Sequence, residues 1–463
     1  MGREMRLAVI ILAAGKGKRM KSRKVKMLHL LSGSPMLRYT VDLASRLKAE
    51  RAIVVIGHQG EELKRIFHGE GIEFCLQKKQ LGTGDAVRCA QNILKDFSGT
   101  VLILCGDVPL TRLETLKQLI ELHTFSRATV TVLTTMVKDP AGYGRIVRNK
   151  RGTVVRIVEE KDTSKRERII SEINSGIYCI EKNFLFQALP GIKKENAQAE
   201  YYLTDVLSMA ARERKKVSAL IAVDPDEVMG INDRADLAKA ERIMRERINT
   251  DLMREGVTIV DPASTYIDKG VTIGKDTIIY PNCIIQGHTV IGENCTIESG
   301  VTIIDSKTGS EVVVKSCSVI TKCTIGNRVS IGPFAHLRPE THLEERVKIG
   351  NFVEVKKSRI GKGSKASHLS YIGDTTMGEG VNVGAGTITC NYDGEKKHHT
   401  HIEDRVFIGS DTQFIAPVRI GKDSVIGAGS TITRSVPPFS LAVSRARQVN
   451  YKRVFIKRGE KKK

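Results

Sequence analysis

The carboxyl-terminal half of the sequence has an aliphatic residue at every sixth position, a period that neither a helix nor an ordinary strand shows. The first run consists of isoleucines: Ile267, Ile273, Ile279, Ile285, Ile291, Ile297 and Ile303. After a slip at Gly309, we expect the ladder to resume as Val313, Val319, Ile325, Ile331, Leu337, Leu343, Ile349 and Val355. A third run comprises Ile402, Ile408, Phe414, Ile420, Ile426 and Ile432. Hexapeptide repeats predict a parallel β-helix, in which three repeats form one triangular coil with the aliphatic side chains inside.

The ladder is expected to break at residues 361–401, where polar residues gather. The segment 389–401 does not fit a triangular coil, so we expect it to protrude. A repeat domain does not by itself indicate a function, because different functional sites are found on the same kind of fold. The irregular stretch is therefore where we look for the chemistry of this half.

The amino-terminal half alternates apolar runs with stretches of helical spacing. Apolar runs fall at residues 7–12, 52–56, 101–105 and 129–133, and helical spacing at 36–47 and 111–123. Buried strands that alternate with helices predict an α/β, doubly wound (Rossmann-like) parallel sheet. Ligands bind such sheets at the carboxyl ends of the strands.

The 463 residues are too many for one hydrophobic core. We predict an α/β domain over residues 1–232, a linker helix over 233–255, and a β-helix over 256–463 that ends in a basic tail from Tyr451. Apolar residues spaced by three and four between Leu237 and Leu252 indicate the helix, and Gly256 is expected to end it.

The formal net charge of +22 favours anionic partners: nucleic acid, acidic membranes or phosphorylated metabolites. Tryptophan is absent and aromatic residues make up 5%, which disfavours the stacking of bases on aromatic side chains. A basic scaffold that binds nucleic acid is the non-enzyme alternative, and only the charge suggests it. The nine cysteines show no metal-ligand spacing, and neither a secretion signal nor a membrane-spanning run is present. We expect a cytoplasmic protein with small-molecule substrates and with neither nucleic acid nor membrane as partner.

Three loops that follow predicted strands carry chemistry. The first contains Gly15 and Gly17, which let backbone amides approach a phosphate, and residues 16–26 include seven basic side chains. A solvated basic loop is the alternative, because the Gly-Lys-Ser/Thr ending of a Walker loop is missing. The loop at 77–86 combines glutamines, which can pair with a base edge, with glycines. Asp107 ends the third strand, either as a magnesium ligand or as the cap of a turn.

Six motifs of the amino-terminal half carry a resemblance to a known family. They are LeuAlaAlaGlyLysGly from Leu12, GlnLeuGlyThrGly from Gln80, GlyAspValPro from Gly106, GlyTyrGlyArgIle from Gly142, IleValGluGluLysAsp from Ile157 and GluIleAsnSerGly from Glu172. Together they resemble nucleotidylyltransferases that act on sugar 1-phosphates. The repeat half narrows the resemblance, over almost the whole chain, to bacterial bifunctional N-acetylglucosamine-1-phosphate uridylyltransferase/glucosamine-1-phosphate acetyltransferase.

The resemblance implies an enzyme that acetylates glucosamine 1-phosphate with acetyl-coenzyme A. The same enzyme then transfers UMP from UTP to N-acetylglucosamine 1-phosphate and releases pyrophosphate. It also implies that the β-helix is left-handed and that the protein is a homotrimer. The enzyme alternative is a related sugar-1-phosphate nucleotidylyltransferase with a different sugar, nucleotide or acyl preference.

For uridylyl transfer, the resemblance implies roles for residues of several loops. The nucleotide would be bound by Leu12, Ala13, Ala14, Gly15, Gln77, Gln80, Gly82 and Thr83. The sugar would be held by Gly144, Glu159 and Asn174. Asp107 and Asn232 would ligate Mg²⁺. Arg19 and Lys26 would stabilise the triphosphate and the charge that develops as pyrophosphate leaves.

The lysine assignment rests on a segment that departs from the family pattern. The family has Leu-Pro-Lys before a Val-Leu-His-like segment, whereas this chain reads ArgLysValLysMetLeuHis from Arg23 to His29. Alignment on Leu28 and His29 assigns the catalytic lysine to Lys26, with Lys24 as its competitor.

For acetyl transfer, the resemblance implies that His368 is the general base and that Glu354 orients it, a role that suits the near-neutral pKa of histidine. The sugar phosphate would be bound by Arg338, Lys356, Tyr371 and Asn382. Acetyl-coenzyme A would be bound by Ala385, Asn391, Tyr392, Ser410, Ala428 and Arg445, with the amide near Ala385 facing the thioester oxyanion.

Lys26→Ala is expected to slow uridylyl transfer on the order of 10²-fold, because it removes a cation from the developing charge. Lys24→Ala should leave the rate nearly unchanged. Pyrophosphate release from UTP and N-acetylglucosamine 1-phosphate measures both variants, and equal losses would contradict the assignment to Lys26.

Overall fold

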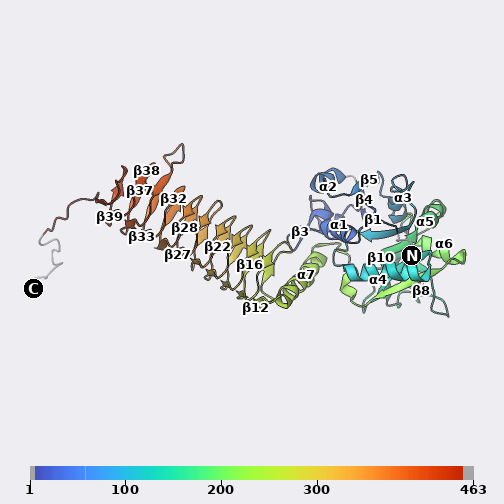
Figure 1. Ribbon diagram of the computed structural model, residues 1–463. Helices are drawn as coiled ribbons and strands as arrows, with labels where there is room; N and C mark the ends of the chain where they lie inside the picture. Colours follow the sequence, from blue (N-terminus) through green and yellow to red (C-terminus); the bar gives the residue numbers. More distant parts are fainter. Residues whose placement is uncertain (1–5, 58, 452–463) are drawn as a thin grey trace, which may run out of the picture. The chain divides into compact units, whose positions relative to one another are not determined.

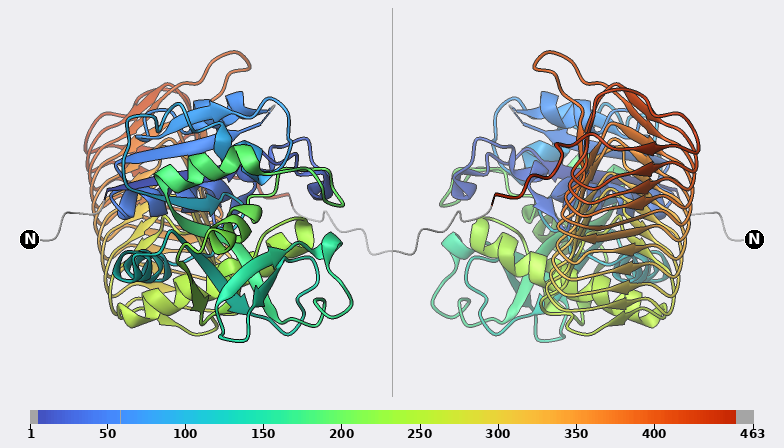
Figure 2. Two further views of the ribbon diagram at one scale, coloured as in Figure 1. Left: turned by 90° about the vertical axis from the view of Figure 1, so that its right-hand side faces the viewer. Right: turned by 90° about the vertical axis from the view of Figure 1, so that its left-hand side faces the viewer.

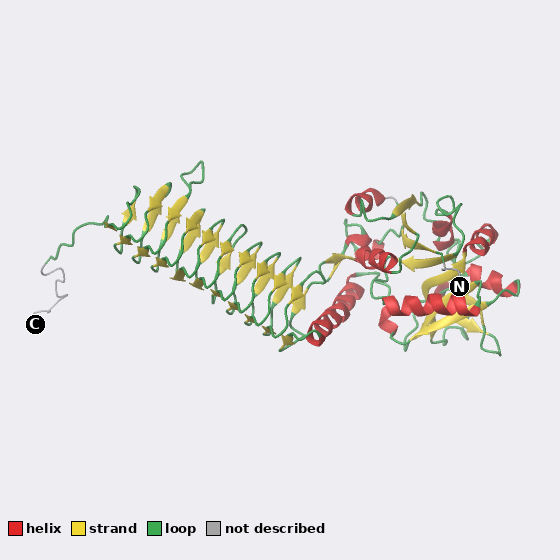
Figure 3. Ribbon diagram, viewed as in Figure 1, coloured by secondary structure: helices red, strands yellow, loops and turns green. Residues whose placement is uncertain are grey.

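The computed structural model describes residues 6–57 and 59–451, so the predicted basic tail after Tyr451 lies outside the described residues. The chain divides into two compact units, Met1–Met244 and Arg245–Lys463. The first combines helices and strands, and the second consists largely of short strands and turns (Figure 1, Figure 3). Helix α7, Arg234–Arg254, contains the boundary between the units and covers the stretch for which a linker helix is predicted.

The first unit is built on a nine-stranded sheet whose main path runs β11-β7-β10-β6-β1-β4-β5. These strands are β1 (Leu7–Ala13), β4 (Arg51–Ile56), β5 (Glu73–Leu76), β6 (Thr100–Cys105), β7 (Val130–Met136), β10 (Glu172–Glu181) and β11 (Val217–Ala222). The hairpin of β8 (Arg145–Arg148) and β9 (Val154–Val158) joins the sheet at β10. All four predicted strands are present.

The sheet departs from the predicted parallel arrangement at β10 and at the β8–β9 hairpin, whose pairings are antiparallel. Strand β10 runs antiparallel to both β6 and β7. The sequence does not predict β10 as a buried strand, because polar residues and Gly176 interrupt its apolar pattern. In the structure, the pairing of β10 with β7 shifts register between Asn174 and Tyr178.

Helices cover both faces of the sheet, as a doubly wound fold requires. In β1, Ala8 and Ile10 face one apolar cluster, and Val9 and Ile11 face the other. The first cluster includes residues of α3 (Thr83–Arg88), α5 (Lys182–Ala188) and α6 (Asp205–Arg212). The second includes residues of α1 (Met36–Arg46), α2 (Gly60–Ile66) and α4 (Leu113–Ser126). Burial on both faces explains why the strands read as continuous apolar runs.

The second unit is a parallel β-helix with three sheets of 11, 10 and 9 strands, and successive coils add one strand to each sheet. The first coil contains β12 (Thr258–Ile259), β13 (Tyr266–Ile267) and β14 (Thr272–Ile273), and the last strands are β39 (Val425–Ile426), β40 (Thr431–Ile432) and β41 (Leu441–Ala442). The ladder residues stack in register, as Ile279 does on Ile297, and form one continuous core.

The ladder differs from the predicted one after the slip at Gly309. Val314 and Ile320 are fully buried, whereas Val319 is 37% exposed, so the predicted inward positions Val313 and Val319 are wrong by one residue. The cause is a step of five residues between the inward Ile303 and Thr308. A second step of five, from Ile320 to Ile325, restores the predicted register.

The predicted break at residues 361–401 is also wrong for most of its length. The ladder continues inward through Ile360, Ala366, Ile372, Met377, Val383 and Thr389, all buried, and resumes at Ile402. Ala366 is small and Thr389 is polar, and steps of five residues from Val355 to Ile360 and from Ile372 to Met377 break the count of six. The continuity is therefore hidden from a search for aliphatic side chains at every sixth position. Only residues 391–399 leave the coil, between β34 (Ile388–Cys390) and β35 (Thr400–Ile402). This loop projects from the stack of coils in both views of Figure 2.

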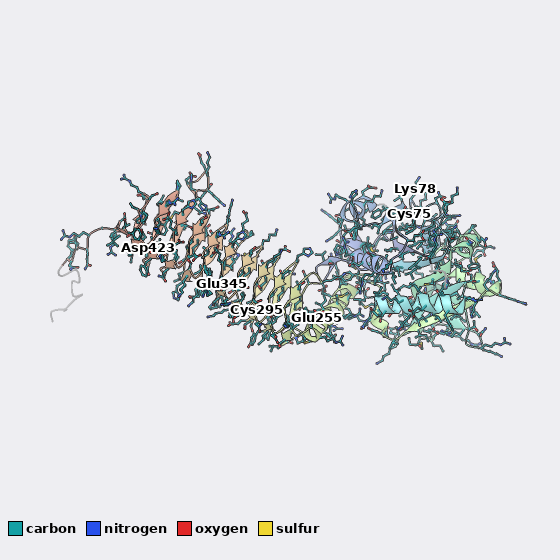
Figure 4. All side chains as sticks on the ribbon, in the orientation of Figure 1. Cys75, Lys78, Glu255, Cys295, Glu345 and Asp423 are labelled. Carbon is teal, nitrogen blue, oxygen red and sulfur yellow. The ribbon has the colours of Figure 1, made fainter. Side chains whose placement is uncertain are left out.

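Charged side chains form ion pairs along the outside of the coils. Glu345 lies 3.2 Å from Lys362, and Asp423 lies 2.7 Å from Arg405; both acids are labelled in Figure 4. Exposed pairs of this kind contribute little to stability, because water and salt screen them. The stability of the stack therefore comes mainly from the inward ladder. Among the described residues, no helix is apolar over a length sufficient to cross a membrane.

Ile320→Ala should destabilise the protein by about 2–5 kcal/mol, because it leaves a cavity in the ladder. Its neighbour Val319→Ala should cost less than about 1 kcal/mol, because that side chain faces outward. Denaturant unfolding of the full chain, followed by circular dichroism, measures both. A larger loss for Val319→Ala would contradict the observed register.

Candidate active sites

A cavity of about 640 Å³ opens at the carboxyl ends of β1 and β6. Most of the predicted nucleotide residues line it: Leu12, Ala14, Gly15, Gln77, Gln80, Gly82 and Thr83. Ala13 instead lines an adjoining cavity of about 230 Å³ that shares Ala14, Gly15 and Gln80 with the first. Parallel pairing explains this convergence, because Leu12 pairs with Cys105 and the loops after the two strands begin side by side.

The glycine loop of the cavity is anchored to a segment that sequence reasoning missed. Gly82 has a φ of 114°, and a Cβ there would lie 2.5 Å from the backbone oxygen of Tyr201. The backbone nitrogen of Leu203 donates to Thr83 Oγ1 at 3.0 Å. Glu200, in the same segment, lines the cavity. The segment offers little signal in the sequence, because its tyrosines and leucine also fit a core strand.

The two predicted glutamines have different surroundings. Gln77 is buried, and its Nε2 donates to the backbone oxygen of Gly82 at 3.1 Å and to Asp85 Oδ2 at 2.9 Å. Gln80 Nε2 is buried without an acceptor among the described residues. Buried donors are normally satisfied, so the Nε2 of Gln80, a residue that lines both cavities, is an exception among the described residues.

The cationic side of the cavity is centred on Lys26. Its Nζ lies 2.6 Å from Asp107 Oδ2 and 3.5 Å from Asn232 Oδ1, and Arg19 donates to the same Asn232 oxygen at 2.8 Å. Lys26 begins a 3-10 helix, Lys26–Leu28, and is 9% exposed. Lys24 is exposed and does not line the cavity. The structure thus places Lys26, not Lys24, beside the predicted metal ligands.

The oxygens of Asp107 and Asn232 fit a small hard cation. Both approach the Lys26 ammonium, so a positive charge already lies against this pair of oxygen donors. The backbone nitrogen of Ile231 donates to the backbone oxygen of Asp107 at 2.9 Å and ties the two segments together. No group of three His, Cys, Asp or Glu side chains in the described parts of the chain could hold a metal. A Mg²⁺ ion here would complete its shell with water and phosphate oxygens, as it commonly does.

The predicted sugar residues form a cluster beside the cavity. The backbone nitrogen of Asn174 donates to the backbone oxygen of Gly144 at 2.9 Å, and a Cβ on Gly144 would lie 3.5 Å from Glu159 Oε2. Thr204 Oγ1 donates to Glu159 Oε1 at 3.2 Å, a contact that the sequence did not predict. Burial, with acidic neighbours adding to it, raises the pKa of Glu159.

Cys105 connects the sugar cluster to the cavity. It lines the cavity, and its Sγ donates to the backbone oxygen of Gly176, two residues after Asn174. Burial raises the pKa of this thiol to about 12, so it stays protonated at neutral pH. The thiol therefore contributes contact surface rather than a nucleophile.

A second candidate site lies on the β-helix, where basic and polar side chains converge. Arg338 donates to Glu354 Oε1 at 2.8 Å, and Glu354 pairs in register with Tyr371 on the next coil. The side chain of Lys397, together with Arg338, lowers the pKa of Lys356. Arg338, Lys356 and Lys397 form a cationic group suited to a phosphate. Sequence reasoning missed Lys397, whose signal is a lysine pair in the protruding loop.

The remaining polar residues of this site come from neighbouring coils. A Cβ on Gly373 would lie 2.5 Å from the Tyr371 hydroxyl and 2.8 Å from Asn391 Nδ2, so Tyr371 and Asn391 are close. Asn391 Nδ2 donates to Asp374 Oδ2 at 2.5 Å. Asn382 is exposed on β33 (Asn382–Val383), the strand next to β30 (Lys365–His368), which ends in His368.

The partner of His368 differs from the predicted one. His368 Nδ1 lies 2.6 Å from Asn351 Oδ1, its register neighbour on the preceding coil. Glu354, the predicted orienting residue, lies in a different sheet and accepts from Arg338 instead. In the tautomer with the proton on Nδ1, the ring donates to the Asn351 amide oxygen, and Nε2 is free to act as a base.

Four of the six predicted coenzyme A residues lie in one column of turns on successive coils: Ala385, Ser410, Ala428 and Arg445. Three contacts connect the column: Asp411 N donates to Ala385 O at 2.7 Å, Gly429 N to Ser410 O at 2.8 Å, and Arg445 NH1 to Ala428 O at 2.6 Å. The column continues to the His368 turn, where Gly386 N donates to Leu369 O at 3.1 Å. Tyr392 lies in the protruding loop, where its hydroxyl donates to the backbone oxygen of Gly394. An elongated ligand along the column would reach His368.

Comparison with known proteins assigns both units. Residues 8–225 match the nucleotidyl transferase family, residues 264–360 the GMPPB C-terminal domain, and residues 399–434 the bacterial transferase hexapeptide (six repeats) family. The chain is 55% identical over 445 residues to the bifunctional protein GlmU of Geotalea uraniireducens, covering 96% of this chain and 97% of that protein. The chain belongs to the GlmU family. The GlmU proteins of Pelobacter propionicus and Shouchella clausii are 54% and 49% identical, over 96% and 95% of this chain and 97% of each relative.

Membership of the GlmU family confirms the predicted resemblance and the prediction of a bifunctional transferase. The predicted fold class, a doubly wound α/β domain followed by a left-handed parallel β-helix of hexapeptide repeats, is confirmed as well. The individual roles of the site residues stay predictions.

Asn351→Ala should lower kcat for the predicted acetyl transfer by on the order of tenfold or more, because it removes the group that orients His368. Glu354→Gln should act mainly on KM for the sugar phosphate, through its partner Arg338. Steady-state release of coenzyme A separates the two effects. A larger fall in kcat for Glu354→Gln than for Asn351→Ala would restore the original assignment of Glu354.

Proposed function

We propose that the chain makes UDP-N-acetylglucosamine from glucosamine 1-phosphate in two steps at two separate sites. Acetyl-coenzyme A first acetylates the sugar amine, and UTP then donates UMP to the sugar phosphate. The observation that carries this proposal is the presence, in one chain of the GlmU family, of two distinct clusters that each suit one of the reactions. A basic nucleic-acid-binding scaffold would need neither cluster.

In the uridylyl step, an oxygen of the sugar phosphate attacks the α-phosphorus of UTP, and the bond to pyrophosphate breaks. The cavity binds the nucleotide on the glycine loops, with Gln77 and Gln80 in its lining. Lys26 and Arg19 neutralise the charge that develops on the leaving pyrophosphate. Asp107 and Asn232 would hold Mg²⁺, which supplies further neutralisation of the triphosphate charge when bound.

In the acetyl step, the amine of glucosamine 1-phosphate attacks the thioester carbonyl of acetyl-coenzyme A. His368 Nε2 takes a proton from the amine, and Asn351 holds the ring through Nδ1. The backbone amide near Ala385 faces the oxyanion, and the coenzyme A thiolate leaves. Arg338, Lys356 and Lys397 hold the sugar phosphate in place.

A homotrimer and a cytoplasmic location are parts of the proposal. The hexapeptide-repeat domain supports the trimer. The nine cysteines, all within the described residues, are free thiols, which supports a reducing compartment. A different sugar, nucleotide or acyl preference is the alternative within the enzyme class.

His368→Ala should abolish release of coenzyme A from acetyl-coenzyme A and glucosamine 1-phosphate, because the base is lost. Pyrophosphate release from UTP, N-acetylglucosamine 1-phosphate and Mg²⁺ should stay nearly unchanged in the same variant, because the nucleotide site lies in the other unit. Parallel loss of both activities would count against two separate sites.

The same assays test substrate preference in the wild-type protein. Glucose 1-phosphate and dTTP should each replace the proposed substrates poorly. Faster turnover of either one would establish the alternative specificity, and removal of Mg²⁺ by a chelator should stop pyrophosphate release.

A further inference from the structure

Arg145 is the largest fully buried side chain in the described part of the chain, with 2% of its surface exposed. A buried guanidinium has lost its hydration, so it needs partners within the fold. Its NH1 lies 2.7 Å from Glu160 Oε2 and donates to the backbone oxygen of Tyr143. Its Nε has no acceptor among the described residues. The uridylyl mechanism above gives this buried cation no role.

Gly144, Glu159 and Asn174, the proposed sugar-binding residues, are each adjacent to Arg145 or to a residue that pairs with it. Gly144 directly precedes Arg145 in the chain. Glu159 lies between two partners of Arg145 in the chain. Val158 is the register partner of Arg145 in β9, and Glu160 is the ion-pair partner of Arg145. Asn174 follows Ile173, the register partner of Arg145 in β10. Arg145 is therefore the point at which the three strands that present the sugar residues meet.

We propose that Arg145 is a positioning residue for the sugar 1-phosphate: through Glu160 and the Tyr143 carbonyl it fixes the relative places of Glu159 and Gly144. The inference rests on the proposed uridylyl function and deepens it. Arg145 itself makes no contact with substrate in this account. The contact with the Tyr143 carbonyl fixes the backbone just before Gly144. The ion pair with Glu160 fixes the backbone just after Glu159, where the chain leaves β9.

The sugar cluster leaves little room for error in these positions. A Cβ on Gly144 would lie 3.1 Å from Ile157 Cγ2 and 3.5 Å from Glu159 Oε2. Glu159 is held on its other side by the Thr204 hydroxyl. A small displacement of either loop would change the shape of the surface that the sugar meets, and misplacement of about 1 Å can cost about 10²-fold in rate.

The same hairpin contains a matched control. Arg156, on β9, forms an ion pair with Glu167 at 2.5 Å, but it is 52% exposed and its register partner is Val147. Like the Arg145 pair, the Arg156 pair joins an arginine of the β8–β9 hairpin to a glutamate. Arg156 and its partners, however, are not adjacent in the chain to any of the three proposed sugar-binding residues.

The test compares steady-state constants of the full-length protein and its variants in pyrophosphate release. Arg145→Lys keeps the charge but loses the forked donor, so KM for N-acetylglucosamine 1-phosphate should rise on the order of tenfold. KM for UTP and the rate of coenzyme A release should stay nearly unchanged. Glu160→Gln, which keeps the shape but loses the charge, should shift the same KM in the same direction by less. Arg156→Lys should behave as wild type.

An unchanged KM for the sugar phosphate in Arg145→Lys, or an equal rise in both KM values, would overturn the inference and leave Arg145 with a purely structural role. If Arg145→Lys does not fold, Glu160→Gln decides by the same criterion. If the wild-type protein rejects this sugar phosphate, the proposed function fails. The Arg145 comparison is then made with whichever sugar 1-phosphate the wild type accepts.

Discussion

Parallel, in-register pairing of strands is the constraint on which both units depend. In the α/β unit, pairing of Leu12 with Cys105 brings the loop of Lys26 to the loop of Asp107. In the β-helix, the same kind of pairing makes Asn351 and His368 neighbours although a full coil separates them in the chain. Each site is thus assembled from residues near the ends of parallel strands, which is where open α/β sheets also bind their ligands.

The sequence predicts the type of both folds well because their patterns repeat. The prediction fails where counting matters, because a single step of five residues moves the inward positions that follow it by one until a second step of five restores the register. Val313 and Val314 are both aliphatic, so residue type alone does not tell which of them faces inward. At Ala366 and Thr389 the inward residue is small or polar, and the ladder disappears from the sequence although the coil continues.

Site residues in local motifs were predictable, whereas their partners depended on register or tertiary contacts. Lys26 and Asp107 each follow a recognisable strand and loop, but Asn351 is identified as the partner of His368 only when the coil is counted correctly. Thr204, which directly precedes helix α6, contacts Glu159 from far along the chain. In both sites, basic side chains lie together where a phosphate group of the substrate is expected to bind. Part of the net charge of +22 therefore serves the binding of phosphate groups.

The central claim is that one chain contains two independent sites joined only by a released intermediate. The most direct test is formation of UDP-N-acetylglucosamine from glucosamine 1-phosphate, acetyl-coenzyme A and UTP by a mixture of two variants, one without Lys26 and one without His368. The account predicts that the variant without His368 forms no product alone, that the variant without Lys26 forms it only slowly, and that the mixture forms it at a rate close to that of the wild type. Failure of the mixture, with each variant retaining its single partial activity, would contradict it.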